Sequence, residues 1–231
     1  MPPTSKRRRA RNTTVPLRES KTAKRVRAQA VLEKLIEVFP DAQTALDYRN
    51  PFELLVATLL SAQCTDKRVN KETPALFAAM PNAQTMAKAS VDDIRVFVKS
   101  INFFNNKAKN LHKTANILVD KHGGEVPDTM EDLVELAGVA RKTANCVLGQ
   151  GFGKPLGVVV DTHVGRIARR LNFTVEADPV KVERDLMALF PQVRWVYISH
   201  AWIDLGRPIC TARKAKCDEC PLAVLCPQVI D

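Results

Sequence analysis

Long apolar runs are missing from this sequence. Although 45% of its 231 residues are hydrophobic, no run approaches the roughly 18 to 20 apolar residues that a membrane-spanning helix needs. A secretory signal peptide is also absent. The sequence therefore predicts a soluble protein. It is too long to need the disulfide staples of a small secreted domain, which disfavours two disulfides among its six cysteines.

Acidic residues are nearly absent from the first 27 positions. This segment carries ten Lys or Arg against one acid, Glu19, whereas the other 204 residues carry 25 basic and 24 acidic side chains. The net charge of +10 is therefore no evidence that the folded body binds nucleic acid. Residues 1–23 are predicted to be a disordered basic tail with a non-specific attraction for phosphate. The tail is compatible with a nuclear or mitochondrial targeting signal if the protein is eukaryotic. It is also compatible with a cytoplasmic, nucleoid-associated protein if the source is a bacterium.

Strand patterns are also scarce, since the only strand-like run, residues 158–160, has no partner. Residues 108–118 instead carry apolar side chains at spacings of 3, 4 and 3, which predicts a helix with Lys107, Lys109 and Lys113 on its solvent side. Similar patterns predict helices over residues 26–38, 52–63, 91–101, 163–171 and 180–190. Proline disfavours a helical residue before it, so helices should end near Phe39, Thr73 and Phe190. The predicted fold is all-α.

One stretch of ten residues, 136–145, has the sequence Leu-Ala-Gly-Val-Ala-Arg-Lys-Thr-Ala-Asn. Gly138 separates two helical patterns and permits a left-handed turn, so the stretch predicts a helix, a tight hairpin and a second helix. The start of the second helix would offer free N–H groups and a positive dipole end to phosphate. Lys142 lies in that first turn, where partial desolvation would lower its pKa and favour a nucleophilic neutral amine. A solvated surface lysine is the more common alternative.

A second polar site follows the apolar run 158–160. Asp161 is placed to cap the next helix through its carboxylate. Alternatively, Asp161 faces Lys142 and accepts its proton or stabilises a developing cation. Sequence spacing alone leaves both roles open.

Four of the six cysteines lie within the last 22 residues at the spacing C-x6-C-x2-C-x5-C. One loop of this kind can wrap a single metal centre, and we expect a 4Fe-4S cluster. Zinc is the competing metal, but structural zinc usually takes two separated C-x2-C pairs and only one is present. The predicted ligands are Cys210, Cys217, Cys220 and Cys226. Cys64 and Cys146 are expected to be small hydrophobes in helices.

Three separated motifs together resemble one known family. They are L-x-G-V-x-R-K-T-A-N at residues 136–145, V-D-T-H at residues 160–163 and the cysteine spacing. This combination is similar to the endonuclease III family of the helix-hairpin-helix DNA glycosylase superfamily, and the likeness extends from about residue 28 to 227.

The resemblance implies two helical domains. Residues 44–155 would form a six-helix barrel that contains the helix-hairpin-helix at about 129–150. Residues 24–43 and 156–231 would form a discontinuous iron-sulfur domain.

The resemblance also assigns roles. Lys142 would be the nucleophile and Asp161 its catalytic partner. DNA would be contacted by six residues: Gln63, which fills the gap left by a flipped base, Phe103, which acts as a wedge, and Gly138, Ala140, Arg141 and Thr143 of the hairpin. For Phe103, packing in the core is the alternative. The family hairpin is usually L-P-G-V-G, so Ala137 and Ala140 depart from it.

The implied function is a bifunctional DNA glycosylase and abasic-site lyase. It would remove oxidised pyrimidines from double-stranded DNA and cut the strand by β-elimination through a Schiff base on Lys142. A monomer with no membrane partner is expected. An adenine-type glycosylase is one alternative. Enzymes of that group generally lack the lysine and carry an additional C-terminal domain, whereas this sequence has Lys142 and ends at Asp231. A non-catalytic iron-sulfur protein that binds DNA or senses redox state is the other.

Overall fold

The computed structural model describes residues 18–229, and regular structure in this part of the chain is helical. Eleven α-helices and two short 3₁₀ helices are present, with no β-strand among the described residues. The all-α prediction is therefore confirmed. Residues 158–160 belong to no strand or helix. The predictions for residues 1–17 lie outside the described residues.

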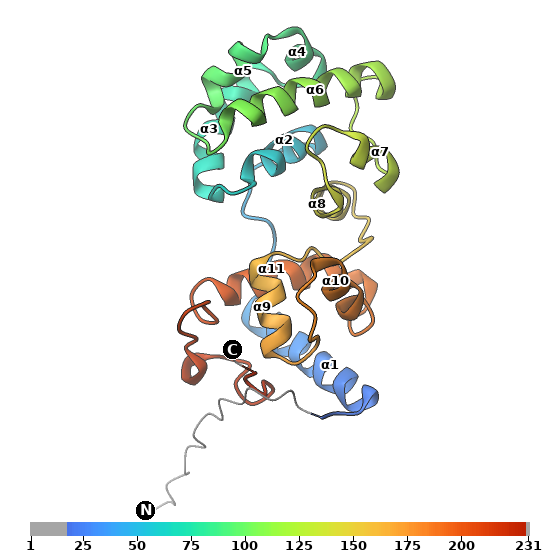
Figure 1. The fold of residues 1–231 in the computed structure, drawn as a ribbon, viewed down its shortest axis with the longest axis vertical. Helices are drawn as coiled ribbons and strands as arrows, with labels where there is room; N and C mark the ends of the chain where they lie inside the picture. Colours follow the sequence, from blue (N-terminus) through green and yellow to red (C-terminus); the bar gives the residue numbers. More distant parts are fainter. Residues whose placement is uncertain (1–17, 230–231) are drawn as a thin grey trace, which may run out of the picture. The chain divides into compact units, whose positions relative to one another are not determined.

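Two compact units make up the chain (Figure 1). One consists of Thr44–Leu156, and the other joins the residues up to Gln43 with those from Gly157 onward. Each unit has its own core of buried apolar side chains.

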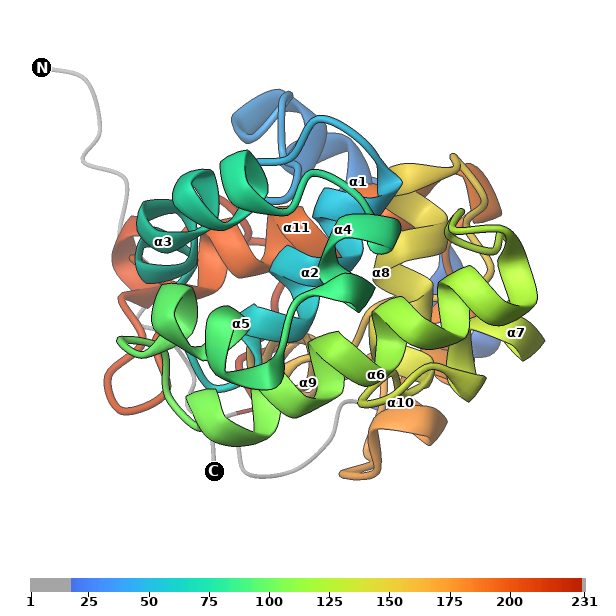
Figure 2. The same cartoon turned by 90° about the horizontal axis from the view of Figure 1, so that it is seen from above.

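The first unit, Thr44–Leu156, is built around α2, in which eight of eleven side chains are buried. Helix α2 packs against α3, α6 and α8, and Figure 1 shows α6 on one side of it and α8 on the other. Helices α4 and α5 pack on α6 (Figure 2). The helices of this unit are α2 (Pro51–Ser61), α3 (Asp66–Ala79), α4 (Ala83–Lys88), α5 (Val91–Val98), α6 (Phe104–His122), α7 (Met130–Glu135) and α8 (Arg141–Gly151).

The second unit has the fully buried Trp202 at its centre. Its indole stacks on the Phe173 ring at 6.2 Å and meets the Phe190 ring edge-on at 5.9 Å. Aromatic pairs of this kind add to the stabilisation from area burial alone. The helices of this unit are α1 (Lys21–Val38), α9 (Thr162–Arg170), α10 (Pro179–Met187), η1 (Gln192–Arg194), α11 (Trp195–Gly206) and η2 (Cys217–Glu219).

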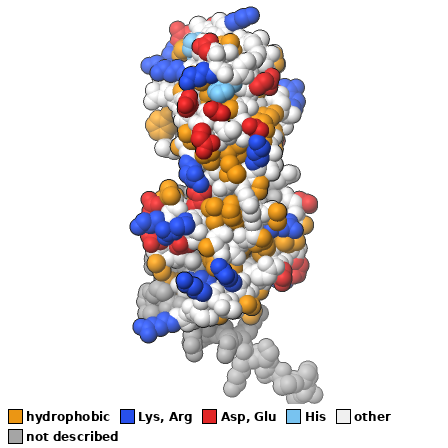
Figure 3. All heavy atoms as spheres, turned by 90° about the vertical axis from the view of Figure 1, so that its right-hand side faces the viewer, with side chains coloured by type: hydrophobic (Ala, Val, Ile, Leu, Met, Phe, Trp, Pro, Cys, Tyr) orange, Lys and Arg blue, Asp and Glu red, His pale blue; other side chains and the backbone are white. Residues whose placement is uncertain are grey.

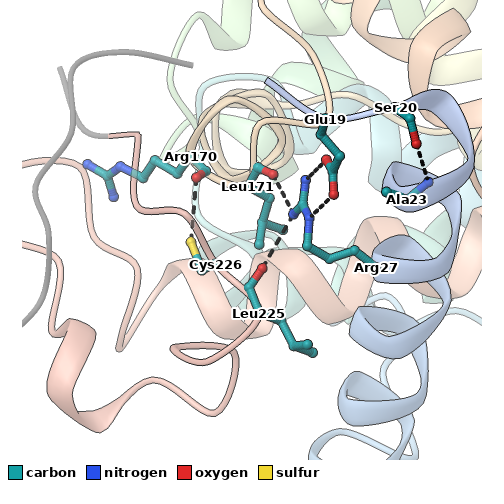
Figure 4. Close-up of polar contacts among 8 residues, drawn as sticks. All are labelled: Glu19, Ser20, Ala23, Arg27, Arg170, Leu171, Leu225 and Cys226. Atoms are coloured by element: carbon teal, nitrogen blue, oxygen red, sulfur yellow. Dashed lines mark hydrogen bonds and ion pairs between the residues drawn. The ribbon is translucent and has the colours of Figure 1, made fainter. Parts of the chain in front are cut away.

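Arg27 of α1 connects the two chain ends within this unit (Figure 4). Its guanidinium pairs with Glu19 at 2.7 Å and donates to the carbonyls of Leu171 at 2.7 Å and Leu225 at 3.4 Å. It also lies 4.7 Å from the centre of the Phe173 ring. The C-terminal loop is thereby tied to α1.

The predicted tail of residues 1–23 overlaps this ordered region. Helix α1 begins at Lys21 because Ser20 caps it, accepting from the Ala23 N–H at 3.1 Å. The pair between Glu19 and Arg27 fixes the chain before the cap. The predicted tail therefore extended too far along the chain, because Glu19, Ser20 and the first residues of α1 are ordered.

Three local predictions also fail. Lys107 was expected on the solvent side of α6 but is only 8% exposed. Pro74 does not end a helix; it lies inside α3, whose neighbouring Thr73 and Leu76 are buried and hold both halves in the core. Cys64 lies in the turn between α2 and α3 rather than in a helix.

Charge is mixed on the face of the molecule that Figure 3 shows. On the face drawn in Figure 3, Lys and Arg side chains are interspersed with Asp and Glu on each unit. This agrees with the nearly balanced charge of the sequence after residue 27. Within the described residues, no helix has the length and apolar character to cross a membrane.

Candidate active site and metal centre

A tight hairpin joins α7 to α8 through residues 136–140. Gly138 has φ +80°, so the predicted left-handed turn is confirmed. A Cβ on Gly138 would lie 2.7 Å from the Asn110 side-chain nitrogen, so the position is crowded as well as strained for other residues.

Both flanks of the hairpin are anchored in the first unit. Leu136 and Val139 are buried, and the Thr114 hydroxyl donates to the Ala137 carbonyl at 3.1 Å. Gly138, which lies between Leu136 and Val139, is exposed, and so is Ala140 directly after Val139. The hairpin therefore presents its backbone to solvent from a fixed base.

Ala140 is the N-cap residue of α8, with extended backbone angles of φ −94° and ψ 168°. Because φ is negative, the glycine found here in the usual family pattern is not required. Alanine has no side-chain acceptor, so α8 lacks the side-chain cap that is present at the start of α5 and α7. The first turn of α8 is therefore not satisfied by a side-chain cap.

Lys142 is exposed in this first turn. The partial desolvation that the sequence suggested is not found in the structure. Arg141 is also exposed and Thr143 is half-buried. The amine of Lys142 is accessible to a large substrate.

Asp161 caps α9, as one of its two predicted roles required. Its Oδ1 accepts from the N–H groups of His163 and Val164, both at 2.8 Å, and its Oδ2 lies 3.0 Å from His163 Nδ1. These contacts fix the orientation of the carboxylate. Asp161 and Lys142 belong to different units, and a catalytic partnership between them stays a prediction.

Gln63 and Phe103 lie in two neighbouring turns of the first unit. Gln63 follows α2 and Phe103 is the N-cap residue of α6. The Asn102 side chain joins the turns by donating to the Gln63 carbonyl at 2.8 Å. Phe103 is 61% exposed, so the alternative of core packing for its ring is wrong.

The four C-terminal cysteines line one pocket, together with Arg170 and Gln228. Each thiol is free. In the described part of the chain, no three His, Cys, Asp or Glu side chains form a group that could hold a metal ion. The cysteines thus share a pocket without the close approach that one ion would need.

Burial controls the chemistry of these thiols. It raises the pKa of Cys217 and Cys220, and it raises that of Cys226 to about 12. The Cys226 thiol donates to the Arg170 carbonyl at 3.5 Å (Figure 4). Thiolates in this pocket therefore need a compensating positive charge, which a metal centre supplies.

Two arginines of α9 hold the start of the cysteine loop. Arg170 donates to the Cys210 sulfur at 3.3 Å and to the carbonyls of Thr211 at 2.7 Å and Ala212 at 3.0 Å. Arg166 donates to the Cys210 carbonyl at 3.0 Å. Neither arginine was among the predicted site residues, although their i, i+4 spacing on the helix that Asp161 caps was the available signal.

Comparison with known proteins gives consistent matches. Residues 56–192 match the family described as HhH-GPD superfamily base excision DNA repair protein. Endonuclease III of Synechocystis sp. is 50% identical over 205 residues, covering 89% of this chain and 94% of that protein. The chain belongs to the endonuclease III family. A second endonuclease III, from Escherichia coli, is 40% identical over 197 residues and covers 85% of this chain and 92% of its own.

Solved structures of the endonuclease III family agree. A non-covalent endonuclease III–DNA complex superimposes with a TM-score of 0.83 at 39% identity, covering 89% of this chain and 96% of that one. A trapped covalent endonuclease III–DNA intermediate gives the same values. A thermostable thymine-DNA glycosylase, at 21% identity and a TM-score of 0.79, shares the fold.

Membership in this family defines the general activity. The protein is a DNA glycosylase and abasic-site lyase of base excision repair, and DNA is its partner. The non-catalytic alternative is therefore set aside.

Proposed function

We propose that Lys142 is the nucleophile of an oxidised-pyrimidine glycosylase and β-lyase. A neutral Lys142 amine attacks C1′ of the damaged nucleotide and expels the base. The sugar ring then opens at the C1′–O4′ bond as O4′ takes up a proton, which leaves a Schiff base between C1′ and Lys142. Loss of a proton from C2′ then expels the 3′ phosphate and cuts the strand. The observation that carries this proposal is an exposed lysine in the first turn of α8, directly after a hairpin with exposed backbone.

Asp161 is the proposed acid–base partner in this reaction. Its contacts with His163 and Val164 hold the carboxylate in one orientation. A fixed carboxylate handles protons and stabilises a developing cation without reorganising during the reaction.

The proposed DNA contacts come from the first unit, and the protein acts as a monomer on chromosomal DNA. The start of α8 offers N–H groups and a positive dipole end to a backbone phosphate, assisted by Gly138, Ala140, Arg141 and Thr143. Phe103 is exposed and able to stack on bases, while Gln63 fills the space of an extruded nucleotide.

The cysteine pocket is the proposed seat of a 4Fe-4S cluster. Four free thiols and sulfur-directed donors fit such a group: the Arg170 guanidinium reaches Cys210, and the Gln228 N–H reaches the Cys226 sulfur at 3.4 Å. Structural zinc usually takes two separated C-x2-C pairs, and only one such pair, Cys217 and Cys220, is present in the loop. When bound, the cluster would order the loop that carries exposed Arg213, Lys214 and Lys216, so that these basic side chains can face phosphates.

Borohydride trapping tests the proposed nucleophile. Reduction of the Schiff base should join the parental protein covalently to a duplex that contains an oxidised pyrimidine. Lys142→Gln should lose the trapped complex and keep DNA binding, because only the amine is removed. Lys113→Gln removes the same charge from an exposed site on α6 and serves as the control. Parental trapping by Lys142→Gln would refute the assignment. Excision of adenine without strand cleavage would instead indicate the adenine-type activity.

A further inference from the structure

Lys107 is a buried cation on α6 with two main-chain partners. Its Nζ donates to the carbonyl of Leu60 at 2.8 Å and to that of Ala62 at 2.6 Å. Both carbonyls lie at the C-terminal end of α2, where carbonyls lack helical partners and the dipole favours a cation. Burial lowers the pKa of Lys107, opposed by the nearby Cys64 thiol. The ammonium thus satisfies carbonyls at the end of α2, although the sequence pattern placed Lys107 on the solvent side of its helix.

The same segment reaches the Gln63 turn at a second point. The Asn102 side chain donates to the Gln63 carbonyl at 2.8 Å, so the carbonyls of both Ala62 and Gln63 are held. The backbone N–H of Lys107 donates to the Phe103 carbonyl at 3.1 Å. Lys107 is therefore bonded to both turns.

The backbone at both turns is strained. Gln63 has φ +54° and Phe103 has φ +58°, and only Asn172 and Gln228 share this non-glycine conformation in the described part of the chain. This conformation is unfavourable for a residue with a side chain, and it persists only where the surroundings hold it. Lys107 and Asn102 provide those surroundings.

The side chains presented by this strained pair are available to a ligand. Both residues are exposed. The amide of Gln63 has no hydrogen-bond partner among residues 18–229, and the Phe103 ring is 61% exposed. The structure thus holds a free amide and a free ring at two adjacent, fixed points.

We propose that Lys107 and Asn102 are positioning residues that hold Gln63 and Phe103 as one pre-organised pair for entry into duplex DNA. The inference rests on the proposed DNA contacts of Gln63 and Phe103. Because the pair is ordered before binding, nucleotide extrusion does not have to bear the entropy of ordering two turns.

The test compares two substrates. A duplex with an oxidised pyrimidine requires extrusion and gap filling, whereas a single strand with an abasic site requires neither. Lys107→Met, which keeps the chain length but removes the donors, should slow duplex excision by about tenfold or more and single-strand cleavage by less than about twofold. Lys113→Met, on the exposed part of the same helix, should change neither rate.

A second variant keeps the test decisive if Lys107→Met does not fold. Asn102 is exposed, so Asn102→Ala should fold and show the same selective loss on the duplex. Equal losses on both substrates, or an unchanged duplex rate in Asn102→Ala, would overturn the positioning role.

A combined variant separates this inference from the proposed DNA contacts. Gln63→Ala with Phe103→Ala should itself slow duplex excision, and adding Asn102→Ala should then cost less than about twofold, because the residues act as one unit. An additive further loss would contradict the inference alone. Parental duplex excision by the Gln63 and Phe103 double variant would instead refute the proposed contacts.

Discussion

The hairpin at residues 136–140 and the cysteine loop from Cys210 to Cys226 place functional groups in opposite ways. The hairpin has buried Leu136 and Val139 on either side of exposed Gly138, and its Ala137 carbonyl accepts from Thr114, only 23 residues earlier. The loop has one short 3₁₀ helix, Cys217–Glu219, and directs its sulfurs into a pocket. Its bonds come from arginines about 40 to 200 residues away. A backbone that binds a ligand from solvent can be specified locally, whereas a pocket that encloses a group needs distant partners.

The comparison predicts different responses to loss of the bound group. Cys217→Ser, or removal of iron, should abolish the visible absorption that an iron-sulfur cluster gives the protein. It should also lower the free energy of unfolding by at least about 3 kcal/mol, because metal binding contributes directly to the folding of such a loop. The hairpin, which needs no metal, should keep its amide protection. Iron and sulfide analysis, calorimetry and hydrogen exchange measure these effects.

Cys146→Ser is the matched control for iron content. Cys146 is half-buried in α8 and outside the pocket, so its replacement should leave iron and sulfide at parental levels. Stoichiometric zinc without iron in anaerobically prepared protein would contradict the cluster assignment.

Asp161 caps α9, the helix that carries Arg166 and Arg170. One substitution can distinguish the contribution of this cap to stability from the contribution of the carboxylate charge to catalysis. Asparagine caps a helix about as well as aspartate, so Asp161→Asn should leave stability nearly unchanged. Loss of the carboxylate should slow single-turnover excision by about 10²-fold. Asp178→Asn makes the same change at the N-cap of α10 and should leave the rate unchanged. A near-parental rate for Asp161→Asn would show that Asp161 acts only as a cap.

Arg170→Met tests how far the loop depends on its distant donors. The change removes bonds to Cys210, Thr211 and Ala212 and should cost about 1–2 kcal/mol, since the acceptors at Cys210 and Thr211 are partly buried and would be left unpaired. Iron should be lost faster to a chelator. Arg169→Met, at the position of α9 directly before Arg170, removes the same charge without breaking bonds to the loop. Equal chelation rates for the two variants would contradict a role for Arg170 in holding the loop.

The sequence correctly predicted those features of the structure that depend on residues close together in the chain. The left-handed turn at Gly138 and the end of α1 at Val38, before Phe39 and Pro40, follow from glycine and proline stereochemistry. The cap at Asp161 follows from its place before a helical pattern. Each of these features depends on residues within one or two turns.

Failures arose where a distant partner decided the outcome. Lys107 lies next to an apolar stripe, and nothing in its own helix indicates that the carbonyls of Leu60 and Ala62 draw it inward. Packing of Leu76 in the core similarly overrides the local preference of Pro74. The arginine bonds to the cysteine loop were invisible for the same reason. Helical periodicity indicates which face of a helix is apolar. It does not indicate which polar groups of other segments a side chain on that helix will bind.

The smallest predicted effect concerns the uncapped start of α8. Ala140 already has the extended backbone of an N-cap residue, so Ala140→Ser should add a side-chain acceptor and raise the free energy of unfolding by about 0.5–1 kcal/mol. In our proposal that hydroxyl competes with a DNA phosphate for the same N–H groups, so DNA affinity should not rise. Ser90→Ala at the N-cap of α5 should lower stability by a similar amount without changing affinity. Tighter DNA binding by Ala140→Ser would show that the first turn of α8 is not the phosphate seat, and that the hairpin positions Lys142 without binding the backbone itself.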